Sequence, residues 1–380
     1  MKTIFKVGLL TLAMGCFTAS CQSEYDIVEN GVYLTDAQSS PIKRVTLDDT
    51  GAKTAITARL GALSGGDVTV NFGSDPQALA AYNLKNGTDY QILPESYYSF
   101  SQTEAIIKAG NIASAPVELQ IKPFDENIDI TKKYAVPVAI VGASGADRLD
   151  ASSALMVLLD QVVVTTVPYL GSGNYIQVNL DQSMEGLTAW TLEWNLKMDA
   201  FGRNNVTQWT ISDSSGKSAV YTRFGDVTCD PNQFQAKVGA GKPQSITRFT
   251  AKKWYHLAFT YDGSNLKLYV DGKLDFIYPH ANPGEAFSFK QITFANPTKS
   301  QYSLKGKVSE LRVWSVARSQ AEIENNMYVV SPDSPGLEIY WKCNEGSGTQ
   351  IIDHSKNLRH GTMKMEASWE EGVRFPDDGK

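Results

Sequence analysis

Hydrolysis of a glycosidic bond needs a pair of carboxylates, which lie about 5 Å apart in a retaining enzyme. The chain has 41 Asp and Glu residues but no Glu-x-Asp-x-Glu run, the spacing that would place such a pair on one strand face. The nearest groups are Asp125 to Asp129, the adjacent Glu370 and Glu371, and the isolated Glu193. Each is interpreted as a solvated loop or strand-face group.

The sequence also lacks the motifs of other kinds of catalytic or cofactor site. There is no Gly-x-Ser-x-Gly elbow for a nucleophilic serine, and Gly239-Ala-Gly241-Lys242 lacks the spacing of a phosphate loop. Four His and four Cys are too dispersed for a zinc module. His256, His354 and His360 are interpreted as structural, so the sequence predicts no catalytic residue and no enzyme.

Other residues of the chain are better suited to binding a sugar than to catalysis. A sugar has apolar faces and hydroxyl edges, and proteins bind it with aromatic rings beside amides, carboxylates and guanidinium groups. Trp209 follows Gln208, and Tyr221-Thr-Arg223-Phe-Gly-Asp226 mixes such groups, with Tyr221 and Arg223 on one face by the period of two. We therefore predict that Trp209, Tyr221, Arg223 and Asp226 contact a glycan. By contrast, Trp190, Leu192, Trp194 and Leu196 alternate on a face predicted to be core.

The N-terminus indicates export. Lys2 and Lys6 precede an apolar run from Val7 to Phe17, too short to span a bilayer, and Thr18-Ala-Ser-Cys21 resembles a bacterial lipobox. Residues 1–21 are predicted as a lipoprotein signal peptide with Cys21 lipidated, and residues 22–30 as a tether. We expect a cell-surface lipoprotein of the outer membrane, held there by its lipid anchor only. The net charge of -6 argues against nucleic acid as a partner.

Residues 31–165 show the alternation of short strands. Apolar residues recur at every second position around residues 56–60, 68–72, 117–121 and 136–140. Asp75-Pro76 to Tyr82 is the one helical turn expected, and Pro137 suggests an edge strand. About seven strands predict an antiparallel, immunoglobulin-like β-sandwich. Pro168 and Gly171-Ser-Gly173 indicate a linker over residues 166–174.

The same segment carries a resemblance. With Tyr82-Asn83, Gly87-Thr-Asp-Tyr90, Leu93-Pro94 and Gly110, it resembles the uncharacterised sandwich domain that precedes glycan-binding or glycan-degrading modules in many Bacteroidetes surface lipoproteins. The resemblance implies a spacer or presentation domain.

Residues 175–380 carry a more specific pattern. Trp254 to Lys273 contains two alternating strands around Asp262-Gly-Ser-Asn265, a hairpin signal. Together with Leu304 to Ile323 and Tyr340 to Gly348, it resembles laminin-G-like jelly rolls of the concanavalin A type. The expected fold class is thus all-β, with an N-terminal immunoglobulin-like β-sandwich followed by a concanavalin A-like, laminin-G-type jelly roll.

The resemblance also extends the predicted site. In laminin-G-like domains the loop equivalent to Asn296 to Tyr302 borders the ligand-binding rim, which adds Asn296 and Tyr302 to the glycan-contacting residues. Such domains often bind calcium. Asp213, Asp226 and Asp230 could serve, but no spaced acidic loop is visible, so calcium is a possible cofactor without assigned ligands.

Cys229 and Cys343 could pair in an exported protein, since besides Cys21 they are the only cysteines after the signal peptide. Cys343 stands where the laminin-G-like pattern has an apolar residue. A buried free thiol is therefore the favoured interpretation.

The leading hypothesis is a surface lipoprotein that binds a glycan without cleaving it, beside an outer-membrane glycan importer or a partner glycosidase. One alternative is a glycoside hydrolase with an unrecognised carboxylate pair. A second is a protein-binding adhesin or a structural subunit of a surface complex. In a third, the N-terminal domain carries the binding, with Tyr97-Tyr98 as its candidate residues.

Overall fold

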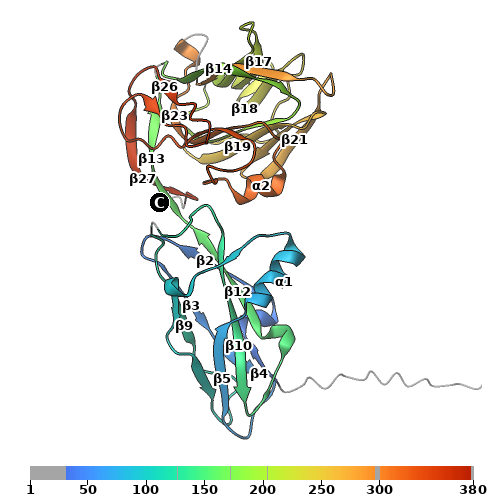
Figure 1. Ribbon diagram of the computed structural model, residues 1–380, viewed down its shortest axis with the longest axis vertical. Coiled ribbons are helices and arrows are strands. Elements are labelled where there is room, and N and C mark those ends of the chain that lie inside the picture. The colour runs from blue at the N-terminus through green and yellow to red at the C-terminus, as the bar shows by residue number, and fades with distance from the viewer. Residues whose placement is uncertain (1–30, 126, 172, 203, 296–299, 378–380) are drawn as a thin grey trace, which may run out of the picture.

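The computed structural model describes residues 31–377, apart from 126, 172, 203 and 296–299. Two β-rich bodies are stacked along the long axis of the molecule (Figure 1), and the all-β prediction is confirmed. The predicted signal peptide, Cys21 and the tether over residues 22–30 lie outside the described residues. In the described part of the chain, no helix is both long and apolar enough to cross a membrane.

The N-terminal body is a β-sandwich built from residues 31–161. Its elements are β1 Gly31–Leu34, β2 Ile42–Leu47, β3 Ala52–Ile56, β4 Ala58–Leu60, β5 Val68–Ser74, α1 Pro76–Asn86, β6 Gln91–Ile92, β7 Tyr98–Phe100, β8 Glu104–Ile107, β9 Val117–Ile121, β10 Tyr134–Ser144, β11 Asp147–Arg148 and β12 Ala154–Gln161, with short 3₁₀ turns at Asp36–Gln38, Glu95–Tyr97 and Asp150–Ser152. The largest sheet has the order β2-β12-β10-β5-β8, and the smaller sheets have the orders β11-β1-β4 and β3-β9-β7.

Two expectations for this body were wrong. The sandwich is not purely antiparallel, because β2 with β12, β1 with β11, and β6 with β10 pair in parallel. Pro137 does not mark an edge, since β10 lies between β12 and β5. The Pro137 carbonyl accepts from the Asp75 N–H, just past the end of β5. The missing N–H of Pro137 points to the same side, where the ladder has already ended.

The predicted helix is present and is longer than expected. The Asp75 carboxylate caps α1 by accepting from the N–H groups of Gln77 and Ala78, and Pro76 occupies the first helical position. Gly87 ends the helix with φ 62°, a left-handed conformation that glycine adopts without strain.

The second body is a jelly roll of two sheets. Its elements are β13 Val163–Leu170, β14 Ile176–Leu187, β15 Trp190–Met198, β16 Val206–Ser212, β17 Ser218–Asp226, β18 Cys229–Val238, β19 Trp254–Tyr261, β20 Asn265–Val270, β21 Lys273–Pro279, β22 Phe287–Phe294, β23 Gly306–Trp314, α2 Gln320–Asn325, β24 Leu337–Trp341, β25 Gln350–Ile351, β26 Gly361–Met363 and β27 Ser368–Phe375, with a 3₁₀ turn at Ser300–Tyr302. One sheet has the order β21-β20-β19-β15-β23-β13-β27, with β24 on β23, and the other the order β18-β17-β16-β22-β14-β26-β25. We call them the β15 sheet and the β16 sheet.

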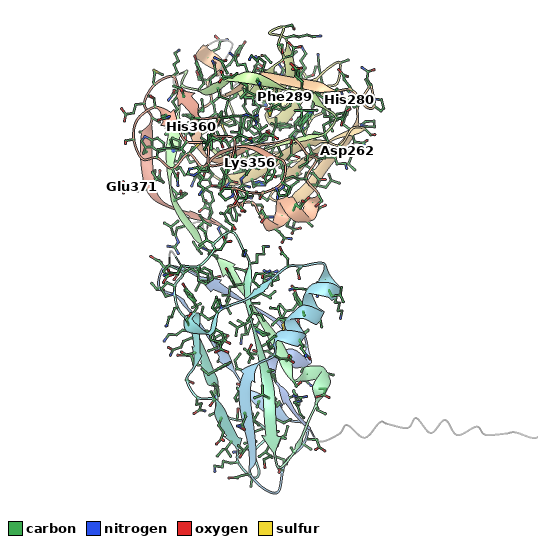
Figure 2. The ribbon with its side chains drawn as sticks, viewed as in Figure 1. Asp262, His280, Phe289, Lys356, His360 and Glu371 are labelled. Atoms are coloured by element: carbon green, nitrogen blue, oxygen red, sulfur yellow. The ribbon has the colours of Figure 1, made fainter. Side chains whose placement is uncertain are left out.

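Aromatic side chains fill the space between these sheets. Trp190, Trp194 and Phe289 are fully buried there, so the face predicted as core is core. Figure 2 shows the density of side chains in this body and labels Phe289 among them. Burial of such rings, each removing roughly 150–250 Å² from water, is the main stabilising contribution of the jelly roll.

The predicted linker over residues 166–174 is instead largely strand. β13 covers residues 163–170 and pairs with both β27 and β23. Only Val162 separates β12 from β13, so one body passes into the other almost without a connecting loop (Figure 1). Pro168 lies inside this strand, opposite Trp369 of β27.

Candidate functional site

Polar side chains gather on the outer face of the β16 sheet, around one arginine. We call Asn205, Thr207, Tyr221, Arg223, Asp226 and Gln235 the Arg223 cluster. Antiparallel pairing places Arg223 of β17 beside Thr207 of β16 and Gln235 of β18. The opposite face of β17 carries Val220 and Phe224, which are buried in the core. The alternation of β17 therefore holds the cluster on the outside of the sandwich.

Hydrogen bonds fix the guanidinium group of Arg223. It donates from Nε to Gln235 Oε1 at 3.0 Å, from Nη1 to Asn205 Oδ1 at 3.0 Å, and from Nη2 to the Asp226 carboxylate. The Tyr221 ring lies alongside, with the guanidinium carbon 5.6 Å from the ring centroid. Such a group is preorganised, because its side chains lose little further freedom when a ligand binds.

The tyrosine is held as a neutral donor. Its hydroxyl lies 2.9 Å from both Asn205 Oδ1 and Thr207 Oγ1, and burial is the main reason that the pKa of Tyr221 is raised. The Arg223 side chain is 12% exposed and that of Asp226 is 25% exposed. The cluster thus presents an aromatic ring, a cation and a carboxylate at a surface that is partly open to water.

Two amides in this region keep an unused polar atom. Gln235 is fully buried, and its Nε2 has no hydrogen-bond partner among the described residues. Gln208 is also buried, and its Oε1 is equally without one in the described part of the chain. A buried polar atom without a partner costs about 1–3 kcal/mol, so this face holds polar groups that are not needed to stabilise the fold.

Trp209 does not belong to this surface, which corrects the prediction. It is fully buried, with its ring 5.0 Å from that of Phe294 and 6.1 Å from that of Trp194. The register between β16 and β17 shifts between Thr207 and Thr210, and this bulge turns the indole inward. The prediction for Trp209 rests on its position beside Gln208, and a bulge that depends on strand pairing is not visible in that local pattern.

The structure brings together only part of the predicted site. Tyr221, Arg223 and Asp226 meet, whereas Asn296 lies outside the described residues. Tyr302 is half-buried in the 3₁₀ turn before β23, on a segment that does not contribute to the Arg223 cluster as described. Sequence reasoning missed Asn205, Thr207 and Gln235. No sequence signal indicates Thr207 and Gln235, because the strand register that places them beside Arg223 is set by long-range pairing.

The three carboxylates considered for calcium have separate partners. Asp213 accepts from Ser215 and from the Lys217 N–H, Asp226 binds Arg223, and Asp230 lies 2.9 Å from the Arg248 guanidinium. Among the described residues, no group of three or more His, Cys, Asp or Glu side chains could hold a metal ion. These aspartates therefore do not form one ligand set.

A second arginine cluster occupies the outer face of the β15 sheet, and it corrects the interpretation of Glu193. This side chain is not solvated: it is fully buried and accepts from Arg312 Nη1 at 3.0 Å and Arg318 Nη1 at 2.7 Å. Arg312 also donates to Glu310, and its guanidinium carbon lies 5.3 Å from the Tyr340 ring centroid. We call Glu193, Glu310, Arg312, Arg318 and Tyr340 the Arg312 cluster.

The Arg312 cluster is sealed by the chain that follows β23. The carbonyl oxygen of Asn326 accepts from Arg312 at 2.8 Å, and Ile323 of α2 packs on Ala258 and Tyr269 of the same sheet. Burial opposes ionisation of Glu193, but the charges of Arg318 and Arg312 outweigh it and lower its pKa. Two carboxylates are near each other here, yet both are occupied by arginine and neither is open to a polysaccharide.

The positions of the other carboxylates, of His256 and of the two thiols are consistent with the non-catalytic roles interpreted from the sequence. Glu370 and Glu371 are exposed on β27, with Glu371 at the periphery of the jelly roll (Figure 2). His256 is buried beside Glu193, with 4.0 Å between Nε2 and Oε2. Cys229 and Cys343 are both buried and free, which confirms the interpretation of Cys343.

The fold and its surfaces define a class: a concanavalin A-like jelly roll carried on an N-terminal β-sandwich, with one polar sheet face open and the other closed. Residues 170–324 match the model of the concanavalin A-like lectin/glucanases superfamily, and residues 28–147 match the model of a family of N-terminal domains. No curated protein matches the chain.

One solved structure shares this fold over most of the chain, and others are similar to parts of it. A Bacteroides ovatus protein assigned as carbohydrate-binding is 21% identical over 90% of this chain and 97% of its own, with a TM-score of 0.62. A heptameric SAP-like pentraxin from Limulus polyphemus is 15% identical over 45% of this chain and 83% of its own, with a TM-score of 0.36. EndoBT-3987 from Bacteroides thetaiotamicron, solved with a Man5GlcNAc product, is 21% identical over 34% of this chain and 30% of its own, with a TM-score of 0.29.

Proposed function

We propose that this protein binds a glycan without cleaving it, through the Arg223 cluster on the β16 sheet. The observation that carries the proposal is the fixed, partly exposed guanidinium of Arg223 with the Tyr221 ring beside it. A sugar hydroxyl can donate to the Asp226 carboxylate or accept from Arg223, while a C–H face of the sugar packs on the Tyr221 ring. The assignment of the Bacteroides ovatus neighbour to carbohydrate binding supports the same function.

The absence of hydrolysis is part of the proposal. Hydrolysis with retention needs two carboxylates about 5 Å apart on either side of the scissile bond. In the Arg223 cluster, Asp226 is the one carboxylate among the described residues and is bound to the arginine. Glu193 and Glu310 are buried under the segment after β23.

The cellular setting is proposed from the sequence. The lipobox-like Thr18-Ala-Ser-Cys21 supports a lipid anchor on Cys21 in the outer membrane, with the N-terminal sandwich as a spacer. A shallow site binds weakly, in the micromolar range or above, because few contacts offset the ordering cost. Such affinity suits a protein that delivers oligosaccharide to a glycan importer or a partner glycosidase.

A glycan array with the wild-type chain and the Arg223→Ala variant tests this proposal, in calcium and then in chelator. We expect the substitution to weaken binding at least about tenfold, because it removes the cation and releases Asp226, Asn205 and Gln235. Arg248→Ala is the matched control, since it removes the same charge from the exposed pair with Asp230. Binding that is unchanged in Arg223→Ala, or an array without hits in both conditions, would contradict the proposal.

A further inference from the structure

Three neighbouring cavities lie at the junction between the N-terminal sandwich and the jelly roll, two of them lined by both bodies and the third by the jelly roll alone. The central cavity, about 390 Å³, is lined by both bodies: Lys133 and Tyr134 lie on the sandwich side, and Asn325 and Tyr328 on the jelly-roll side. It lies where α2 faces the end of the sandwich that carries β2 and β12 (Figure 1). None of the residues of the Arg223 cluster lines it.

The central cavity continues on both sides. A cavity of about 340 Å³ shares Lys133 and Asn325 with it, and one of about 440 Å³ shares Tyr328 and Pro376. Each volume lies within the range of roughly 300–1,000 Å³ that is common for ligand sites, which often occur between domains. Three cavities in a row form a groove, and a groove suits an extended ligand better than a compact one.

The walls of the groove are held in place. Val162 alone separates β12 from β13. The Lys133 ammonium donates to Asn325 Oδ1 across the junction at 2.5 Å, and Arg374 Nη2 lies 3.6 Å from Asp48 Oδ2. The two bodies are therefore tied at the groove itself, where Lys133 and Asn325 line both the central cavity and its neighbour of about 340 Å³, and the site is largely preformed.

The lining combines aromatic rings with polar groups. Tyr90, Phe124, Tyr134 and Tyr328 line the central cavity, and the rings of Phe124 and Tyr134 meet edge to face at 5.5 Å. Amides and an ammonium group that can bind hydroxyls stand among them, from Asn325, Asn326 and Lys133. Rings next to amide, carboxylate and ammonium groups complement the apolar faces and hydroxyl edges of a sugar.

The charges of the central cavity balance. Lys132 and Lys133 stand against Asp160 and Glu324, and Arg44 Nη1 donates to Asp160 at 2.6 Å. Burial is the main reason that the pKa of Lys133 is lowered, so a second cation from a ligand is disfavoured there. The central cavity has both signs in equal number, and the flanking cavities add Asp89, Glu322, Asp271 and Asp377 against Lys253. The groove therefore offers no net attraction to a phosphate or a polyanion.

We propose that this junction groove is a second saccharide site, for a linear, neutral oligosaccharide that both bodies contact. The ligand class rests on the proposed function, whereas the site is separate from the Arg223 cluster. Two sites on different parts of one chain bind a polymer more tightly than either alone, because the second contact is intramolecular. Glycan capture would then involve the N-terminal sandwich directly, through Lys133 and Tyr134.

Calorimetric titration of the full chain with neutral oligosaccharides tests the inference. The probes are malto-, cello-, xylo- and manno-oligosaccharides of graded length. Lys133→Met removes the ammonium from the sandwich side, and Tyr328→Ala removes a ring from the jelly-roll side. Lys108→Met, at an exposed pair with Asp67, and Tyr278→Ala, on the outer strand β21, are the matched controls.

We expect two sites for the probe that binds. Lys133→Met and Tyr328→Ala should each weaken one site at least about tenfold and leave the other, while Arg223→Ala does the reverse. If both junction variants bind as the wild type does and Arg223→Ala removes all binding, the groove is not a site and the proposed function stands. If no probe binds, both proposals are wrong. Lys133 is half-buried on the surface of the sandwich, so its variant reports even where Tyr328→Ala does not fold.

Discussion

The outer faces of the two jelly-roll sheets carry clusters of nearly the same residue types, but the two clusters differ in their exposure to water. The Arg312 cluster and the Arg223 cluster each hold a guanidinium group against a carboxylate, with a tyrosine ring at 5.3 Å and 5.6 Å. Arg312 is fully buried, whereas the side chain of Arg223 keeps 12% of its surface exposed. What distinguishes them is the segment that follows β23, which covers one face and has no counterpart over the Arg223 side chain among the described residues.

The comparison shows that an arginine beside a carboxylate and a tyrosine is not by itself a binding site. In the buried Arg312 cluster, these groups form hydrogen bonds and ion pairs with one another and fix how α2 and its flanking chain pack on the β15 sheet. In partial contact with water, the same groups can exchange partners with a ligand at low cost. Exposure to water, and not residue type, therefore determines which of the two clusters can bind a ligand.

The largest expected difference is in stability on removal of the arginine. Arg312→Ala leaves Glu193 and Glu310 buried with fewer cations, and we expect a loss of about 3–5 kcal/mol in the free energy of unfolding. Arg223→Ala should cost less, about 1–3 kcal/mol, because Asp226 keeps partial contact with water while the buried Gln235 loses its partner. Urea unfolding of the two variants measures both. Equal losses would remove the distinction between the clusters. Should Arg312→Ala fail to fold, Arg312→Lys keeps a charge and gives a measurable intermediate loss.

The pH dependence of stability sharpens the comparison, because His256 lies beside the Arg312 cluster and burial lowers its pKa to about 3. In the unfolded chain a histidine has a pKa of about 6.5, so the unfolded state takes up the proton first. This contribution is fully present above about pH 6.5 and is lost as the pH falls toward 3, at up to ~1.4 kcal/mol per pH unit. We expect His256→Gln to flatten the slope of unfolding free energy between pH 6.5 and 5. The control is His360→Gln at an exposed position, and a slope unchanged in His256→Gln would contradict the assignment.

Removal of one tyrosine hydroxyl gives the smallest effect. The Tyr340 hydroxyl donates to Glu310 Oε2 at 2.7 Å in the buried cluster, and we expect Tyr340→Phe to cost about 1.5–3 kcal/mol, since an ionised acceptor loses its partner. Tyr221→Phe should cost less, about 1 kcal/mol, because the hydroxyl is neutral and Asn205, one of its two partners, is in partial contact with water. Thermal unfolding of the pair measures the difference, and a larger cost at Tyr221 would reverse the roles.

Local features of the fold were predictable from the sequence. The hairpin from Trp254 to Asp271 is present, because Asp262 accepts from the N–H groups of Ser264 and Asn265 within the turn. The cap at Asp75 and Pro76 is equally local. Such features depend on a few neighbouring residues, and these neighbours are fixed by the chain itself.

The predictions that were wrong, or that could not be made, concern features that depend on distant parts of the chain. Alternation correctly places Glu193 on the outer face of its strand, but nothing near it in sequence indicates that residues 320–327 cover that face. Trp209 turns inward at a bulge defined by its pairing with β17. The groove at Lys133 and Tyr328 joins two bodies, and no pattern within either one indicates it.

The position of β13 has a consequence for the order in which the chain folds. Each strand pair of the N-terminal sandwich lies within residues 31–161, so this body can form while the rest is still being made. In contrast, β13 lies between β23 and β27, and β27 is the final strand described. During synthesis, the first strand of the jelly roll must wait as an unpaired edge until its two neighbours emerge, and the closure of so long a loop is slow. A completed sandwich directly before it, joined through Val162, keeps that waiting strand attached to a folded body and away from other chains.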